Sequence, residues 1–325
     1  PLGTSHKALE AIKNSSSNAA RYPDGSTQEL RKALAEFNNL NMDNIICGNG
    51  SDEILSMFAN CFAGPGDEII YSQHGFLVYP IAAKAAGASP IVATEKDYKA
   101  DVEEIIKVCS NKTKICFIAN PNNPTGTYLT RQELITLRKE LPQDCLLVID
   151  SAYAEYVDKK DYTNGIELTT KYNNIACTRT FSKIYGLAAL RIGWAYASKE
   201  VVELLNRIRL PFNINAIAQK AAVAALQDTK FIDNAVEHNN IWKPFIEKEL
   251  QKNEIEIIPG VGNFVLAKFK NIKQANACYS YLENNNIFVR KVSEYGLPEF
   301  LRITVGLEKE NIFICKIINE FMEKN

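Results

Sequence analysis

A lysine stands out in the segment between Thr178 and Trp194. Hydroxyl residues precede Lys183 at positions 180 and 182, and Arg191 follows further along the same segment. A lone lysine is most often a solvated surface charge, but Lys183 lies between two strand-like segments. Burial and neighbouring cations favour the neutral amine, so the segment is typical of a nucleophilic lysine.

An acid and an amide each follow a run of apolar residues. Asp150 comes directly after the run 146–149, and the sequence 120–126 (Asn-Pro-Asn-Asn-Pro-Thr-Gly) follows the run 115–118. A carboxylate at the end of a buried strand is costly unless a cation or several donors meet it. The alternative for Asp150 is an ordinary helix N-cap. The two prolines fix an irregular loop, which indicates that one Asn amide is held against a ligand.

A tight turn at 48–53 (Gly-Asn-Gly-Ser-Asp-Glu) leads into a predicted helix. Unpaired N–H groups and the positive end of the helix dipole suit an anion such as phosphate. Glu53 stands where a dinucleotide-binding fingerprint would have glycine, which disfavours an NAD site. Taken alone, the turn is equally compatible with a simple helix cap.

The elements that carry these residues alternate between strands and helices. Apolar strand-like runs around 45–47, 68–71, 114–119 and 145–149 are separated by segments with helical spacing, such as 51–62. Continuous apolar strands between helices indicate an α/β fold with a mostly parallel central sheet and helices on both faces. The candidate residues follow the strands, and ligands bind at that edge of such sheets.

The pattern changes after residue 210, where two helices (216–226 and 230–253) precede a mixture of strands and helices. We expect a large domain over 15–228 and a smaller α+β domain over 229–325, with residues 1–14 associated with the smaller one. Pro244 is expected to kink or split the second helix. The chain starts without methionine, so we also expect N-terminal residues to be missing.

Composition excludes several classes of function. The chain has 325 residues, 37 Lys plus Arg and 38 Asp plus Glu, so its net charge of −1 gives no reason to expect nucleic acid or a membrane as partner. Its apolar runs are shorter than a bilayer span of about 20 residues. Eight cysteines without a CxxC pair, and three histidines, suggest reduced thiols in a cytoplasmic protein and no metal site.

Together, these segments resemble the pyridoxal-phosphate (PLP) enzymes of the aspartate-aminotransferase fold (fold type I), and within them the histidinol-phosphate aminotransferase family. The resemblance extends from Pro1-Leu2-Gly3-Thr4 to the segment 301–306. It implies that Lys183 forms the Schiff base with the cofactor and that Asp150 pairs with the pyridine nitrogen. Asn123 and Tyr153 would hydrogen-bond the phenolic oxygen of the cofactor.

The resemblance also implies where the rest of the cofactor and a second subunit lie. The residues expected to hold the phosphate are Ser51, Asp52, Thr180, Ser182 and Arg191. Phe76, or less plausibly His74, would stack on the ring. Tyr22 would reach the cofactor phosphate of the neighbouring subunit, which implies a homodimer.

Substrate recognition is expected at Arg302, with Arg290 as a second basic residue and Asn123 beside them. A guanidinium fork can hold a phosphate or a carboxylate. The implied reaction is transamination between L-histidinol phosphate and 2-oxoglutarate, which gives imidazole-acetol phosphate and glutamate in histidine biosynthesis. An aromatic aminotransferase and a threonine-phosphate decarboxylase stay open as alternatives, as does the PLP-binding sensor domain of a transcriptional regulator.

Overall fold

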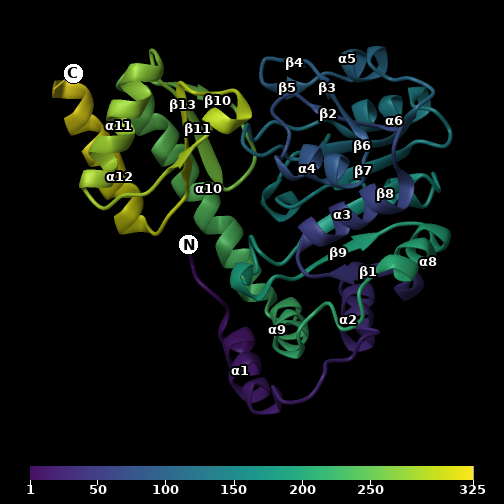
Figure 1. Cartoon of the computed structure of the whole chain (residues 1–325). Helices are drawn as coiled ribbons and strands as arrows, with labels where there is room; N and C mark the ends of the chain where they lie inside the picture. The colour runs from purple at the N-terminus through teal and green to yellow at the C-terminus, as the bar shows by residue number, and fades with distance from the viewer. Residues whose placement is uncertain (325) are drawn as a thin grey trace.

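The computed structural model describes residues 1–324, and its larger part is built on a seven-stranded sheet (Figure 1). The strands, in spatial order, are β1 (Ile45–Gly48), β9 (Gly193–Tyr196), β8 (Ile175–Thr180), β7 (Leu146–Asp150), β6 (Thr113–Ala119), β2 (Glu68–Ser72) and β3 (Ser89–Ala93). From β8 to β3 all neighbours are parallel, whereas β9 is antiparallel to both of its neighbours. The predicted mostly parallel sheet is confirmed.

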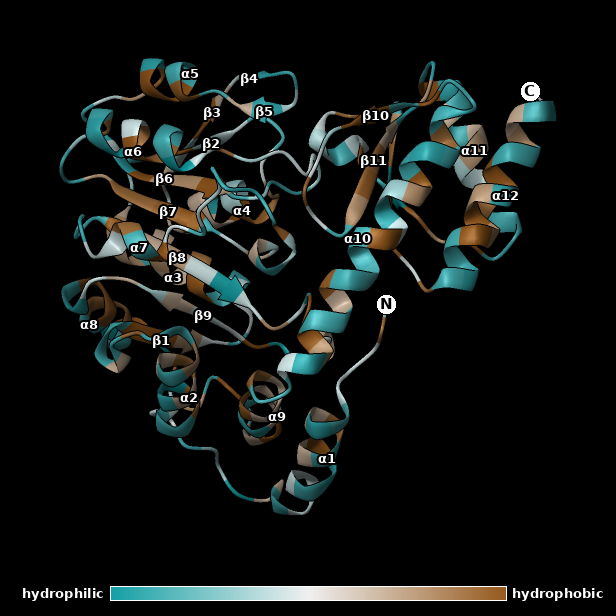
Figure 2. Ribbon diagram, turned by 180° about the vertical axis from the view of Figure 1, so that it is seen from behind, coloured by the Kyte–Doolittle hydropathy of each residue, from teal (hydrophilic) through white to brown (hydrophobic). Residues whose placement is uncertain are grey.

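Helices cover both faces of this sheet because its central strands are apolar on both sides (Figure 2). In β6, Ile115 and Phe117 pack into one core cluster, and Cys116 and Ile118 pack into another. The face of Ile115 and Phe117 is covered by α3 (Ser51–Phe62), α4 (Val78–Ala85) and α8 (Lys199–Ile208). The face of Cys116 and Ile118 is covered by α5 (Val102–Lys107), α6 (Arg131–Glu140), α7 (Ile166–Thr169), α2 (Gln28–Asn38) and α9 (Ala216–Leu226).

A second, antiparallel sheet forms the core of the C-terminal part. Its order is β10 (Glu256–Ile258), β11 (Phe264–Lys268), β13 (Phe300–Thr304) and β12 (Arg290–Lys291), packed with α10 (Thr229–Gln251), α11 (Ile272–Asn284) and α12 (Glu308–Lys324). Pro244 was expected to kink or split this helix, and it does not split it, since α10 is one helix with Pro244 inside it. Pro244 and Asn240 are both exposed, so the carbonyl that lacks its intrahelical partner faces solvent.

The N-terminal helix differs from its expected placement with the smaller domain. Helix α1 (His6–Ser15) packs against α9, and Ala8 belongs to the same core cluster as Leu30 and Leu34 of α2. The remaining elements are η1 (Ser16–Asn18), η2 (Met42–Asn44), the hairpin β4 (Glu95–Lys96) and β5 (Lys99–Ala100), η3 (Ala154–Tyr156), η4 (Ala188–Leu190) and η5 (Ser293–Tyr295). The segment before α1 runs towards the C-terminal part of the chain, as Figure 1 shows, and Pro1 to Thr4 line a cavity together with Phe264 and Arg302 of the second sheet.

Candidate active site

The carboxyl ends of β6, β7 and β8 open into a cavity, which we call the first cavity. It is lined by Ser51, Asp52, Phe76, Ala119, Pro121, Asn123, Asp150, Ala152, Tyr153, Thr180, Ser182, Lys183 and Arg191. Register explains why distant segments meet here, since Asp150 pairs with Ala119 on one side and with Thr178 on the other. Every residue predicted to touch the cofactor from its own subunit lines this cavity, except His74, the alternative to Phe76.

A second cavity adjoins the first and shares three of its lining residues. Tyr153, Ser182 and Lys183 line both, and the second cavity also includes Phe264 and Arg302 of the C-terminal sheet. Lys183 is half-buried, and its Nζ lies 5.2 Å from the centroid of the Tyr153 ring. The amine therefore lies at the boundary between two compartments.

Asp150 is buried, with 5% of its surface exposed, and two hydroxyl groups hold it. The Tyr79 hydroxyl donates to Oδ2 at 3.0 Å, and the Thr178 hydroxyl donates to Oδ1 at 2.8 Å. Burial raises the pKa of this carboxyl to about 6, against the opposing effects of these hydroxyls and of Lys183. The sequence analysis assigned no role to Tyr79 or Thr178. A tyrosine within the apolar helix 78–85 was the available signal, because a buried phenol needs a partner.

The other end of the first cavity is built for an anion. Helix α3 begins at Ser51, after Gly50 in a left-handed conformation with φ +83°. A Cβ on Gly50 would lie 2.5 Å from Arg191 Nη2, and one on Gly193 would lie 2.5 Å from the backbone N of Ser51. A side chain at position 50 would collide with Arg191, and one at position 193 would collide with the start of α3. Glycine at both positions therefore allows Arg191 and the start of α3 to lie close together.

Arg191 connects two parts of this anion-binding end. Its Nη1 donates to Ser182 Oγ at 3.2 Å, and its Nη2 donates to Asp52 Oδ2 at 3.1 Å. The Thr180 and Ser182 hydroxyls line the same end. A guanidinium, several hydroxyls and the first backbone N–H groups of a helix are the donors that bind phosphate monoesters.

Arg302 joins the C-terminal sheet to the loop that follows β6. Its Nη1 donates a hydrogen bond to Asn123 Oδ1, and its guanidinium carbon lies 5.0 Å from the Phe264 ring centroid. The Phe264 ring also packs edge-on against Tyr153, with centroids 5.3 Å apart. Arg302 Nε is buried without a hydrogen-bond partner in the described part of the chain, which is uncommon for a buried polar atom.

The N-terminal residues also line the second cavity, a role the sequence analysis did not assign. Pro1 to Thr4 lie along it, and the Thr4 hydroxyl donates to the carbonyl of Gly186 at 2.7 Å. Gly186 is required by this contact, because a Cβ there would lie 2.1 Å from the carbonyl oxygen of Gly3. The start of the chain is thereby fixed beside the lysine segment.

Three expected residues lie outside both cavities. Arg290 is largely exposed and pairs with Glu294 at 3.4 Å, although it lies opposite Arg302 in the sheet register. His74 is buried, and its Nδ1 lies 2.6 Å from the carbonyl oxygen of Tyr295. It therefore does not face a ring in the first cavity, whereas Phe76 does. Tyr22 is 84% exposed and lies away from the cavities of its own chain.

The residues of the first cavity match the functional groups of PLP. The anion-binding end suits its phosphate, the buried Asp150 carboxylate suits a protonated ring nitrogen, and the Lys183 amine suits its aldehyde. Within residues 1–324, we find no group of three His, Cys, Asp or Glu side chains able to hold a metal ion. No helix in that range has the length and apolarity to cross a membrane.

Comparison with known proteins identifies the class. Residues 1–314 match the family "Aminotransferase class I and II", and the chain belongs to this family. Curated relatives named histidinol-phosphate aminotransferase include one from Maricaulis maris, 45% identical over 324 residues (99% of this chain, 90% of the relative). Another, from Paramagnetospirillum magneticum, is 45% identical over 323 residues (99% of this chain, 89% of the relative).

Solved structures give the same fold. The histidinol-phosphate aminotransferase of Sinorhizobium meliloti in complex with pyridoxal-5'-phosphate superposes with a TM-score of 0.94 at 24% identity, covering 99% of this chain and 88% of that one. That of Clostridium acetobutylicum gives a TM-score of 0.91 at 25% identity, covering 100% and 97%. The predicted aminotransferase class, fold type I architecture and PLP cofactor are confirmed.

Proposed function

We propose that this enzyme transfers the amino group of L-histidinol phosphate to 2-oxoglutarate, giving imidazole-acetol phosphate and glutamate in histidine biosynthesis. The observation that carries this proposal is the 45% identity, over 99% of the chain, to proteins of that name. Solved structures of an L-threonine-O-3-phosphate decarboxylase and of aspartate aminotransferases share the fold at 21–23% identity, which supports fold alone. A non-catalytic sensor domain has no support from these relatives.

Arg302 supplies the chemistry that both substrates need. Its guanidinium lines the second cavity beside Lys183 and has an unpartnered Nε. A planar guanidinium can form paired hydrogen bonds with a phosphate or with a carboxylate. One arginine can therefore hold the phosphate of histidinol phosphate and then a carboxylate of 2-oxoglutarate. Arg290 would contribute only as a second positive charge at the rim.

The residues of the two cavities divide the catalytic work. PLP supplies an aldehyde that condenses with amines and a ring that withdraws electrons from the substrate Cα. Lys183 Nζ, once free, takes the Cα proton as general base and delivers it as general acid. Asp150 would hold the proton on the ring nitrogen, and Tyr153 and Asn123 would hydrogen-bond the phenolic oxygen of the cofactor. Phe76, which lines the same cavity, would stack on the ring.

Single-turnover absorbance traces test the substrate directly. We expect the yellow holoenzyme, mixed with histidinol phosphate and no keto acid, to lose its cofactor absorbance at least about 100-fold faster than with phenylalanine at equal concentration. Arg302 can pair with the phosphate of histidinol phosphate, which carries nearly two negative charges, whereas phenylalanine offers it only a singly charged carboxylate. Equal rates would instead favour an aromatic aminotransferase. Release of carbon dioxide from threonine phosphate would favour the decarboxylase.

We infer that the enzyme is a homodimer with Tyr22 reaching the neighbouring active site. The support is a set of exposed apolar side chains at Tyr22. Its ring stacks on Phe212 with centroids 4.8 Å apart, and Leu210, two residues before Phe212, is 69% exposed.

We also propose a cytoplasmic location, which agrees with all eight cysteines being free thiols.

Mixing two variants with different defects tests the shared site. We expect Tyr22→Ala to bind PLP at least about tenfold more weakly, because each phosphate loses one hydrogen bond from its partner. Refolding Tyr22→Ala together with Lys183→Ala should restore activity at limiting PLP, since mixed dimers contain one site with both residues. If the mixture shows only the sum of the separate activities, Tyr22 acts within its own subunit or has no role in the site.

A further inference from the structure

The hairpin between β4 and β5 has an unusual turn. Asp97 and Tyr98 both adopt left-handed backbone conformations, with φ of 51° and 61°. Glycine and asparagine are the usual residues in such turns, and a bulky side chain is rare there. A strained conformation persists only where the surrounding contacts stabilise it, so the contacts of Tyr98 are informative.

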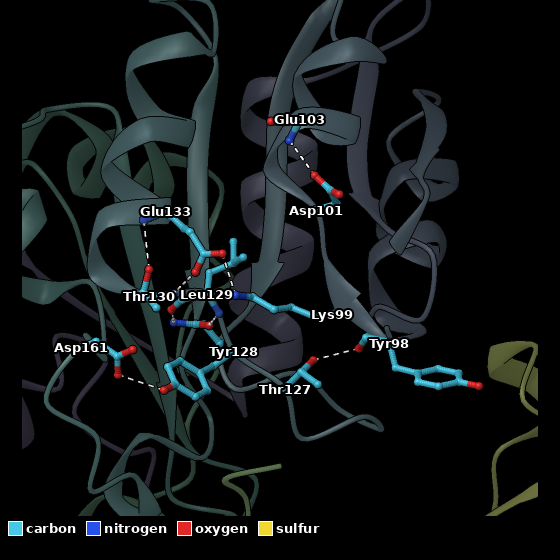
Figure 3. A network of polar contacts seen from close by, with 11 residues as sticks. Tyr98, Lys99, Asp101, Glu103, Thr127, Tyr128, Leu129, Thr130, Glu133 and Asp161 are labelled. Atoms are coloured by element: carbon cyan, nitrogen blue, oxygen red, sulfur yellow. Dashed lines mark hydrogen bonds and ion pairs between the residues drawn. The ribbon is translucent and has the colours of Figure 1, made fainter. Parts of the chain in front are cut away.

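The Tyr98 side chain reaches the C-terminal sheet. Its ring packs edge-on against Phe300, with centroids 5.2 Å apart, and Lys268 Nζ lies 5.8 Å from its centroid. Phe300 and Lys268 face each other in the register of β11 and β13. In Figure 3, the Tyr98 side chain points away from the polar network of Lys99, Thr127 and Tyr128, towards the C-terminal part of the chain.

The backbone of Tyr98 is tied to the loop that carries Asn123. The Thr127 hydroxyl donates to the Tyr98 carbonyl at 2.9 Å, as Figure 3 shows. The loop closes on itself through a backbone hydrogen bond from Asn122 N to the Thr127 carbonyl at 2.8 Å. One residue thus contacts the Asn123 loop with its backbone and the strand of Arg302 with its ring.

Phe300 lies two positions before Arg302 on β13, so the two side chains belong to the same face of that strand. Fixing Phe300 against Tyr98 therefore fixes where the Arg302 guanidinium meets Asn123. We propose that Tyr98 is a positioning residue for substrate binding: it holds β13 against the Asn123 loop, so that Arg302 reaches the oxyanion of the substrate. The nature of that oxyanion rests on the function proposed above.

Other contacts join the two parts of the chain and allow Tyr98 variants to fold. Val261 N donates to the Gly126 carbonyl at 2.8 Å, and His74 contacts the Tyr295 carbonyl. Tyr128 offers a matched control, because it is also half-buried and its ring packs on Tyr162 within the large domain. Replacing Tyr128 removes an aromatic ring near the same loop without touching β13.

The test compares Tyr98→Ala, Tyr98→Phe and Tyr128→Ala as holoenzymes. We expect Tyr98→Ala to raise the KM for histidinol phosphate and for 2-oxoglutarate about tenfold, with kcat within about threefold of the wild type. Loss of an interaction that binds the substrate and the transition state equally raises KM and leaves kcat unchanged. Tyr98→Phe should stay within about twofold because the ring contacts persist. Tyr128→Ala should leave both KM values unchanged.

Hydrogen exchange of the same holoenzymes separates positioning from stability. Tyr98→Ala should exchange faster at 300–304 and 120–127, with an unchanged absorbance spectrum of the bound cofactor. A lower melting temperature with wild-type KM values would overturn the proposal. If the wild type does not react with histidinol phosphate, the proposed function fails. The role of Tyr98 can then still be tested through the KM for 2-oxoglutarate, measured in the exchange of amino groups between glutamate and 2-oxoglutarate.

Discussion

Lys183→Ala should abolish the half-reaction while the protein still folds. General acid–base catalysis by a positioned group contributes about 10²–10⁴-fold, and the covalent link to the cofactor is lost as well. We therefore expect turnover to fall at least about 10⁴-fold. Lys183 lines both cavities with its Nζ at the Tyr153 ring, so few packing contacts outside the site depend on it. Circular dichroism should show an unchanged fold.

Borohydride reduction followed by peptide mass analysis gives an independent measurement. In the wild type, reduction should bleach the yellow colour and attach the cofactor to the peptide that contains Lys183. In Lys183→Ala, no peptide should carry the cofactor. Lys96→Ala, a change at an exposed lysine, serves as the control and should behave as wild type. Near-normal turnover in Lys183→Ala would refute the role of this amine.

Asp150→Ala should lower turnover by several orders of magnitude. A neutral pyridine ring accepts electrons poorly. Asp150 is a buried acid in the first cavity, and we propose that it keeps the ring nitrogen protonated. Steady-state assays at saturating PLP separate this effect from weaker cofactor binding. A fall of less than tenfold would argue against the role of Asp150.

The same carboxylate should destabilise the protein without its cofactor. A folded-state pKa of about 6, against 3.8 in the unfolded chain, costs about 3 kcal/mol when Asp150 is ionised. This cost is complete above pH 6 and disappears as the pH falls below 3.8. Apo Asp150→Asn should therefore unfold at higher urea concentration than apo wild type at pH 8, and the difference should shrink at pH 4. A less stable apo variant at pH 8 would contradict this.

The sequence predicted local elements well where helix and strand signals agreed. Helices 51–62 and 216–226 have the predicted bounds, and Asn215 Oδ1 caps the second by accepting a hydrogen bond from Ala218 N at 2.7 Å. The candidate residues after β6, β7 and β8 converge because parallel strands end at a common edge. Resemblance then supplied what spacing alone left open, namely the cofactor and the role of each residue.

Contacts between distant elements could not be predicted from the sequence patterns that predicted the elements themselves. Tyr79 and Asp150 are hydrogen-bonded although they are 71 positions apart in the sequence, and Thr4 and Gly186 are hydrogen-bonded although they are 182 positions apart. Such pairings depend on sheet register and on how helices pack, which local patterns do not encode. The sequence analysis missed the packing of α1 against α9 for this reason. Helix α10 continues through Pro244 because the proline lies on the exposed face of the helix, where the unpaired carbonyl can face solvent.

The partition between the two cavities consists of Tyr153, Ser182 and Lys183. Because Lys183 lines both cavities, we expect its amine to reach either compartment by rotation about its own side-chain bonds, with little movement of the main chain. Slow steps should therefore arise from ligands entering and leaving rather than from reshaping of the sheet edge.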